Sequence, residues 1–321
     1  SVAVTGVQTC ALPISCSRRP SPTTPFVVVA IAPVATGALR ARSRARLRRS
    51  GRSSSTSASG VAARSAPILA SFARSLANGD GPVLQPGAAP VEGFSSPAWL
   101  AVLVGGRWLG LFDHRAWLGT PDIVAFPKLV AILCCFVTFS AMYAVAVRVS
   151  RHPVLVTIAA GTVTALVPSF VIWAVSGLEN GLFACVVTVL AAVLARAAVT
   201  STMATPRTAI AVGLLAALAA LARPDGVVYA AAFPLAALLV GDRTLLRRNI
   251  IASLMSLGAF AVPVGAYQVW RLLTFGDYLP NTARAKGQAL PGFEAIDRPA
   301  ALLTYLGWLT ALLCAATVAL A

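Results

Sequence analysis

The sequence predicts an all-α, polytopic membrane protein, and three observations support this fold class. Hydrophobic residues make up 58% of the 321 residues and charged residues only 11%, far fewer charges than a soluble domain needs to cover its surface. The mean hydropathy is +0.80. From residue 126 onward, long apolar runs alternate with short polar breaks, as expected where each run crosses a bilayer as a helix. Most of the chain is therefore predicted to be a bundle of membrane helices.

Seven membrane spans are predicted from these apolar runs. They cover residues 126–147, 153–175, 181–198, 208–222, 226–240, 249–270 and 300–321. The two Ala-rich runs, 208–222 and 226–240, are shorter than the roughly 20 residues of a usual span, so we expect them to be tilted or partly buried. Because the last apolar run continues to Ala321 without a polar flank, we also expect the sequence to be truncated there.

Arginines recur on every second connection between the predicted spans. They are Arg148 and Arg151, Arg196 and Arg207, and Arg243, Arg247 and Arg248. The positive-inside tendency assigns these connections to the cytoplasm, so that segments 176–181, 222–226 and 271–299 face outward. We therefore predict a multi-pass protein of the plasma membrane whose functional face is extracytoplasmic.

The apolar run at residues 98–112 is predicted to lie in the membrane interface. A crossing at this point would place Arg148 and Arg151 outside, against the charge pattern. The run is short, carries Arg107, and has Trp99 and Trp108 near its ends, which is typical of an interfacial or re-entrant helix. Residues 65–125 thus form the first extracytoplasmic loop, and residues 126–321 form the transmembrane bundle.

Residues 1–64 differ in character from the rest of the chain. Residues 1–79 hold 11 arginines and no carboxylate, which accounts for most of the net charge of +16. Such a segment could be a basic arm for anionic lipid or a disordered linker. We favour a third interpretation, translation of GC-rich DNA out of frame, since residues 4–14 resemble a translated sequencing-adapter oligonucleotide. The charge is therefore not taken as a nucleic-acid-binding signature.

Five polar motifs follow one another at predicted outward-facing positions. They are NGDGPV at 78–83, VEGFSSPAW at 91–99, WAVSGLE at 173–179, ARPDG at 222–226 and FGDYLPNTARAK at 275–286. In this order, over about residues 71–321, they resemble the GT-C superfamily of glycosyltransferases that use polyprenyl-phosphate sugars. The resemblance is nearest to the actinobacterial arabinofuranosyltransferases that use decaprenyl-phospho-arabinose.

The resemblance implies an inverting transfer of a sugar, such as arabinofuranose, from a polyprenyl-phosphate donor to an envelope polysaccharide. A carboxylate takes the acceptor proton, and cations stabilise the charge that grows on the leaving phosphate. We assign the phosphate to Arg223, Arg284 and Lys286, and substrate orientation to Asn180, Asp225 and Asn281. Glu92 and Glu179 are the candidate carboxylates. No cofactor is identified, and the sequence does not decide whether a divalent metal takes part.

The chain departs from the family at the expected catalytic acids. Relatives carry an Asp-Asp pair about ten residues before a helix that corresponds here to Arg74-Ser75-Leu76, and those positions hold Arg64 and Ser65. Either the reading frame switches between about residues 64 and 72, which we favour, or the chain is a degenerate relative. In both cases the chain as written is expected to be inactive.

Structural interpretations of the same residues stay open. Arg223 with Pro224, Asp225 and Gly226 could form only a turn, Glu179 could cap a helix, and the 284–286 cations could anchor lipid headgroups. A transporter or a non-catalytic membrane protein is the alternative function. Transporters place charges at mid-membrane and show internal repeats, whereas the charges here lie at span ends and no repeat is visible. The cysteines have neither disulfide nor metal-ligand spacing.

Overall fold

The computed structural model describes residues 58–117, 119–174 and 176–277, and this part of the chain is mostly helical. The all-α class is therefore confirmed. One hairpin of two-residue strands, β1 (Ala116–Trp117) and β2 (Thr120–Pro121), precedes the bundle. The helices are α3 (Ala58–Asn78), α4 (Pro97–Trp108), α5 (Asp122–Val149), α6 (Pro153–Ala165), α7 (Pro168–Ala174), α8 (Asn180–Val199), α9 (Pro206–Ala222), η2 (Pro224–Ala231), α10 (Ala232–Val240), η3 (Arg243–Leu245) and α11 (Leu246–Phe275).

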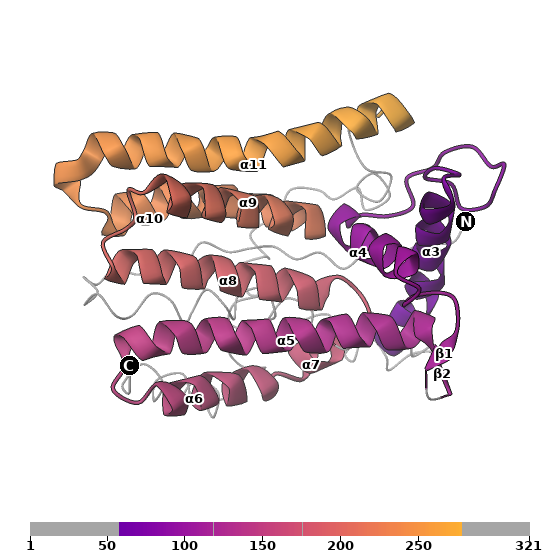
Figure 1. Ribbon diagram of the computed structural model, residues 1–321, viewed down its shortest axis with the longest axis horizontal. Coiled ribbons are helices and arrows are strands. Elements are labelled where there is room, and N and C mark those ends of the chain that lie inside the picture. The colour runs from indigo at the N-terminus through magenta and orange to yellow at the C-terminus, as the bar shows by residue number, and fades with distance from the viewer. Residues whose placement is uncertain (1–57, 118, 175, 278–321) are drawn as a thin grey trace, which may run out of the picture.

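The long helices run side by side in a single bundle (Figure 1). Helix α8 lies between α5 and α9, and α9 packs in turn against α11. Helices α5 and α8 run in one direction and α9 and α11 in the other, because each parallel pair is joined through a segment that returns along the bundle, α6–α7 or η2–α10. Alternate connections therefore gather at the same end of the bundle.

Three helices are long and apolar enough to cross a membrane: α5 with 28 residues, α8 with 20 and α11 with 30. At 1.5 Å per residue, even α8 is about 30 Å long, which matches the hydrocarbon core of a bilayer. Helices α6, α9 and the η2–α10 segment are apolar but shorter. The chain is thus a membrane protein, with three spans supported by length among the described residues; the predicted span at 300–321 lies outside them.

Two predicted spans are interrupted in the structure, which corrects the sequence prediction. Segment 153–175 divides into α6 and α7, with the break immediately before Pro168. Proline disfavours the helical conformation of the residue before it and offers no N–H, so hydropathy alone missed this break. Segment 226–240 begins as the 3-10 helix η2, and only its second half is the α-helix α10.

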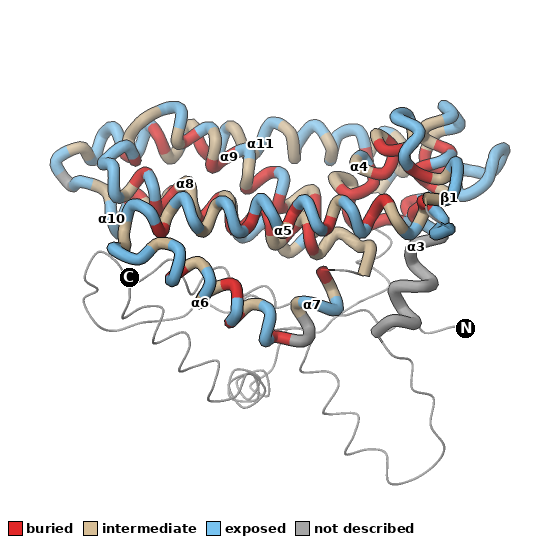
Figure 2. Tube along the Cα trace, turned by 60° about the horizontal axis from the view of Figure 1, so that its bottom comes forward, coloured by how far each residue is buried: buried red, intermediate tan, exposed pale blue. Residues whose placement is uncertain are grey.

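The outer faces of α5 and α11 are largely exposed (Figure 2). Helix α8 is the most enclosed span: 56% of its 18-residue apolar segment is buried. The corresponding segments of α5 and α11 are only 17% and 11% buried. Large apolar side chains such as Phe136, Val262 and Leu273 are exposed on these two helices. An apolar surface of this extent is suited to contact with lipid rather than water.

A small subdomain covers one end of the bundle, and we call residues 68–121 the cap. Phe72, Phe94 and Trp99 of the cap form a core with Phe126 of α5, and Phe275 of α11 packs against it. Helix α4 lies across the bundle end, close to the predicted 98–112 helix (Figure 1). Helix α3 begins at Ala58, inside the segment predicted to be non-native.

The two ends of the bundle differ in charge. The basic end holds the connections α5–α6, α8–α9 and α10–α11, with seven arginines and one carboxylate: Arg148, Arg151, Arg196, Arg207, Arg243, Arg247 and Arg248, with Asp242. The opposite end, which we call the mixed-charge end, carries the cap, the starts of α5 and α8, and the ends of α9 and α11. The alternation predicted from the sequence therefore corresponds to two real ends of the molecule.

Candidate functional site

Arg223 lies at the mixed-charge end because the residues around it stop helix α9. Pro224 forces the preceding residue into an extended conformation, and Arg223 has φ −151° and ψ 137°. Helix α9 therefore ends at Ala222. The chain then folds back so closely that a Cβ atom on Gly226 would lie 2.2 Å from the carbonyl oxygen of Ala219. The Arg-Pro-Asp-Gly motif thus has a structural reason for its proline and its glycine.

The guanidinium of Arg223 joins three elements. Its Nε donates to Oδ1 of Asp225 at 3.0 Å, and its Nη1 donates to Oδ1 of Asn180 at the start of α8. Its Cζ lies 5.5 Å from the centroid of the Phe183 ring, within cation–π range. The Arg223 side chain is only 18% exposed. Three predicted site residues, Arg223 and Asp225 of the Arg-Pro-Asp-Gly motif and Asn180 at the start of α8, therefore meet in one group.

A second ion pair, between Glu92 and Arg271, ties the cap to α11. Oε1 of Glu92 lies 2.7 Å from Nε of Arg271, and the two side chains are 3% and 1% exposed. Nη1 of Arg271 also donates to Oε1 of Gln268 at 2.9 Å, and the Tyr267 phenol interacts with Glu92. Burial of two charges is tolerable only when each satisfies the other. Glu92 therefore holds the cap in place, in addition to any role toward a substrate.

Glu179 occupies the position before the first residue of α8 and is half-buried. Its carbonyl oxygen accepts the backbone N–H of Phe183 at 2.9 Å. Its side chain makes no capping hydrogen bond, so the capping interpretation of this carboxylate is not what the structure shows. Glu179 adjoins Asn180 in sequence and so lies at the edge of the Arg223 group.

The outer side of the cap has its own charge network around Asp113. Arg74 donates to both carboxylate oxygens of Asp113, at 2.7 and 2.8 Å, and Nη1 of Arg107 donates at 2.8 Å. The hydrogen bond to Asp113 raises the pKa of Arg74. Nearby, Oδ2 of Asp122 accepts the backbone N–H groups of His114 and Arg115, both at 2.7 Å. These aspartates organise the loop that leads into α5.

Several predicted site residues fall outside what the structure describes. Asn281, Arg284 and Lys286 lie beyond residue 277. Arg64 and Ser65, at the positions of the expected acidic pair, lie on α3, whose backbone alone is described there. Within the described ranges, no three His, Cys, Asp or Glu side chains are grouped so as to hold a metal ion.

Arg271, the most deeply buried charge of this end, is not among the site residues predicted from the sequence. The sequence places it at the start of an outward loop, whereas α11 continues past it to Phe275. One signal was available: an ionisable residue within an apolar helix needs a partner and often marks a functional region. Its partner could not be chosen, because Glu92 is 179 residues away in the sequence.

Comparisons of this chain with protein families, with curated proteins and with solved structures found no match. The function of the mixed-charge end is therefore inferred from its own residues: the Arg223 group, the Glu92–Arg271 pair and the cap that covers them.

Proposed function

We propose that this chain is a membrane glycosyltransferase of the GT-C type, which takes a sugar from a polyprenyl-phosphate donor. The supporting observation is the meeting of Arg223, Asn180 and Asp225 where α8, α9 and η2 come together. The family resemblance assigns the donor phosphate to Arg223 and the orientation of substrate to Asn180 and Asp225. The sugar, such as arabinofuranose, would pass to an envelope polysaccharide.

The charge distribution supports an extracytoplasmic site in the plasma membrane. The basic end carries seven arginines against one aspartate, which is the composition of cytoplasmic connections. The mixed-charge end then faces outward. A donor held in the outer leaflet by its polyprenyl chain would bring its phosphate to the depth of helix ends, where Arg223 lies.

The transfer breaks the bond between the anomeric carbon and the phosphate oxygen and forms one to the acceptor hydroxyl oxygen. The acceptor proton goes to a carboxylate, and polyprenyl phosphate leaves. Arg223 would stabilise the charge on that phosphate, and its contacts to Asp225 and Asn180 hold its planar fork in a defined orientation. Because Glu92 is only 3% exposed and Glu179 is half-buried at the edge of the Arg223 group, Glu179 is the better candidate for orienting the acceptor. The expected acidic pair is still missing from positions 64 and 65, so this chain would bind the donor without efficient transfer.

Donor binding is testable on the chain as it exists. In nanodiscs, Arg223→Ala should weaken decaprenyl phosphate binding roughly 10- to 100-fold, the range expected for one lost charge-assisted hydrogen-bonding group. Arg223→Lys should lose less, because the charge remains. Binding is measured by native mass spectrometry, with uncharged decaprenol as the reference ligand.

Arg207→Ala is the matched control, because Arg207 is the second residue of α9 and lies at the opposite end of the same helix. It should bind both lipids like the unsubstituted chain. If the unsubstituted chain and Arg223→Ala preferred decaprenyl phosphate over decaprenol to the same extent, Arg223 would not be part of the donor site.

A transporter is the second candidate, and one observation favours it: the break between α6 and α7 interrupts an apolar segment, as in transporters with discontinuous helices. The same nanodisc experiment separates the two. A transporter has no reason to prefer decaprenyl phosphate over decaprenol through Arg223.

A further inference from the structure

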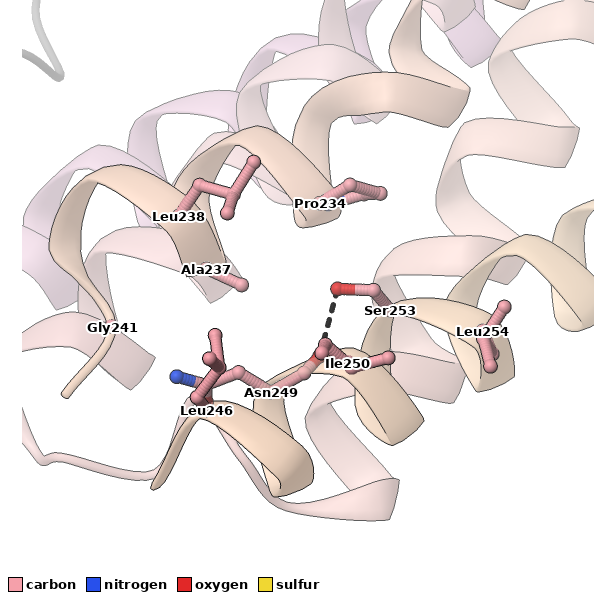
Figure 3. A pocket seen from close by; sticks show the side chains of 9 residues that line it. All are labelled: Pro234, Ala237, Leu238, Gly241, Leu246, Asn249, Ile250, Ser253 and Leu254. Atoms are coloured by element: carbon pink, nitrogen blue, oxygen red, sulfur yellow. Dashed lines mark hydrogen bonds between the residues drawn. The ribbon is translucent and has the colours of Figure 1, made fainter. Parts of the chain in front are cut away.

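An apolar groove runs between α10 and α11 at the basic end (Figure 3). Its volume is about 430 Å³, within the range of natural small-molecule sites. Leu238 of α10 and Leu246, Ile250 and Leu254 of α11 line it and are all more than half exposed. The groove thus opens on the lateral, lipid-facing surface of the bundle.

The polar groups of the groove are already satisfied by the protein. Nδ2 of Asn249 donates to the carbonyl oxygen of Asp242 at 3.0 Å, and the Ser253 hydroxyl donates to the carbonyl oxygen of Asn249 at 2.8 Å. The rest of the lining is aliphatic, with Ala237 and Gly241 leaving space between the helices. A hydrocarbon chain suits such a lining better than a polar ligand does.

The mouth of the groove, at the start of α11, carries a net positive charge. Arg247 and Arg248 follow the lining residue Leu246 in the first turn of this helix and are exposed, and the exposed Asp242 precedes it. With 3.6 residues per turn, Arg247 borders the helix face that lines the groove, whereas Arg248 lies on the opposite side. No carboxylate of the described chain pairs with either. The helix dipole also places partial positive charge at this terminus and disfavours two cations there. An anion at the mouth would relieve both effects.

We propose that this groove binds one anionic phospholipid, with an acyl chain along the groove and the headgroup phosphate at Arg247. The partner is chosen by complementarity: an aliphatic lining open to the bilayer, next to a basic helix terminus at the bundle end. Neutral phospholipids share the chain but lack the net negative charge. This site lies at the opposite end from Arg223 and does not depend on the proposed transferase activity.

The test is native mass spectrometry of the full chain titrated with phosphatidylglycerol and with phosphatidylcholine of the same acyl chains. We expect one tight phosphatidylglycerol per protein, bound at least roughly tenfold more tightly than phosphatidylcholine. Arg247→Gln should weaken phosphatidylglycerol binding roughly fivefold, the effect of one arginine near an anionic headgroup. Ser253→Leu, which fills the groove and leaves both arginines, should weaken both lipids.

Two further variants test the position of the lipid. Arg248→Gln removes the same charge from the same turn of α11, on the side away from the groove, and should leave phosphatidylglycerol binding unchanged. Leu238→Trp blocks the exposed rim if Ser253→Leu fails to fold. Equal losses in Arg247→Gln and Arg248→Gln, equal affinity for both lipids, or full binding in a correctly folded groove-filling variant would each overturn the proposal.

Discussion

Replacing Arg271 with methionine should lower the free energy of unfolding by about 3–5 kcal/mol, because Glu92 would be left buried without its counter-charge. The Glu92 side chain is 3% exposed, and its carboxylate lies 2.7 Å from the guanidinium. Water therefore cannot replace the lost partner. The cap should detach from α11 first, since this pair joins them. Thermal and denaturant unfolding in detergent micelles measures the loss.

The double variant Glu92→Gln/Arg271→Met separates the cost of an unpaired charge from the value of the pair. It should recover most of the stability, because neither remaining side chain is charged. Arg247→Met, at the exposed start of α11, is the matched single substitution and should change stability little. A single Arg271→Met variant as stable as Arg247→Met would contradict the buried position of this pair.

Gly213→Ala should be the second most damaging substitution, at about 2–3 kcal/mol, because α9 and α11 touch at this residue. A Cβ atom there would lie 2.2 Å from the carbonyl oxygen of Ser256 and 2.8 Å from the Cβ of Ala259. The backbone oxygen cannot move aside as a flexible side chain could, so the helices must separate. Close approach through small residues is how membrane helices pack in general.

Gly258→Ala is the matched control for this contact. Gly258 also lies within a helix, α11, but an added Cβ atom would meet nothing within 4 Å. Alanine is a better helix former than glycine, so this variant should be about 0.5–1 kcal/mol more stable in unfolding experiments. If the two alanine variants behaved alike, the described packing of α9 on α11 would be wrong.

Local sequence patterns predicted the features that depend on local chemistry. Proline after Arg223 ends α9 whatever the rest of the fold does, and charge on alternate connections follows from antiparallel helices. The break before Pro168 was missed because the flanking residues are as apolar as those of an unbroken span. Hydropathy measures the environment of a segment and carries little information about its backbone.

Contacts among the site residues follow from the sequence where the partners flank one turn, but not where the partners are distant in the sequence. Asp225 stands two residues from Arg223, and their ion pair needs little more than the turn itself. Glu92 and Arg271 meet only because the cap folds over the end of α11, through apolar contacts such as Phe94 and Phe275. No spacing rule applies to a pair that tertiary packing creates.

The central claim is that the mixed-charge end with its cap faces away from the cytoplasm. Single cysteines in an otherwise cysteine-free chain test it, with Gln85→Cys on the exposed loop of the cap and Arg151→Cys on the exposed α5–α6 connection. A membrane-impermeant maleimide applied to intact cells should label position 85 and should reach position 151 only after permeabilisation. Labelling of position 151 but not of position 85 in intact cells would contradict the account.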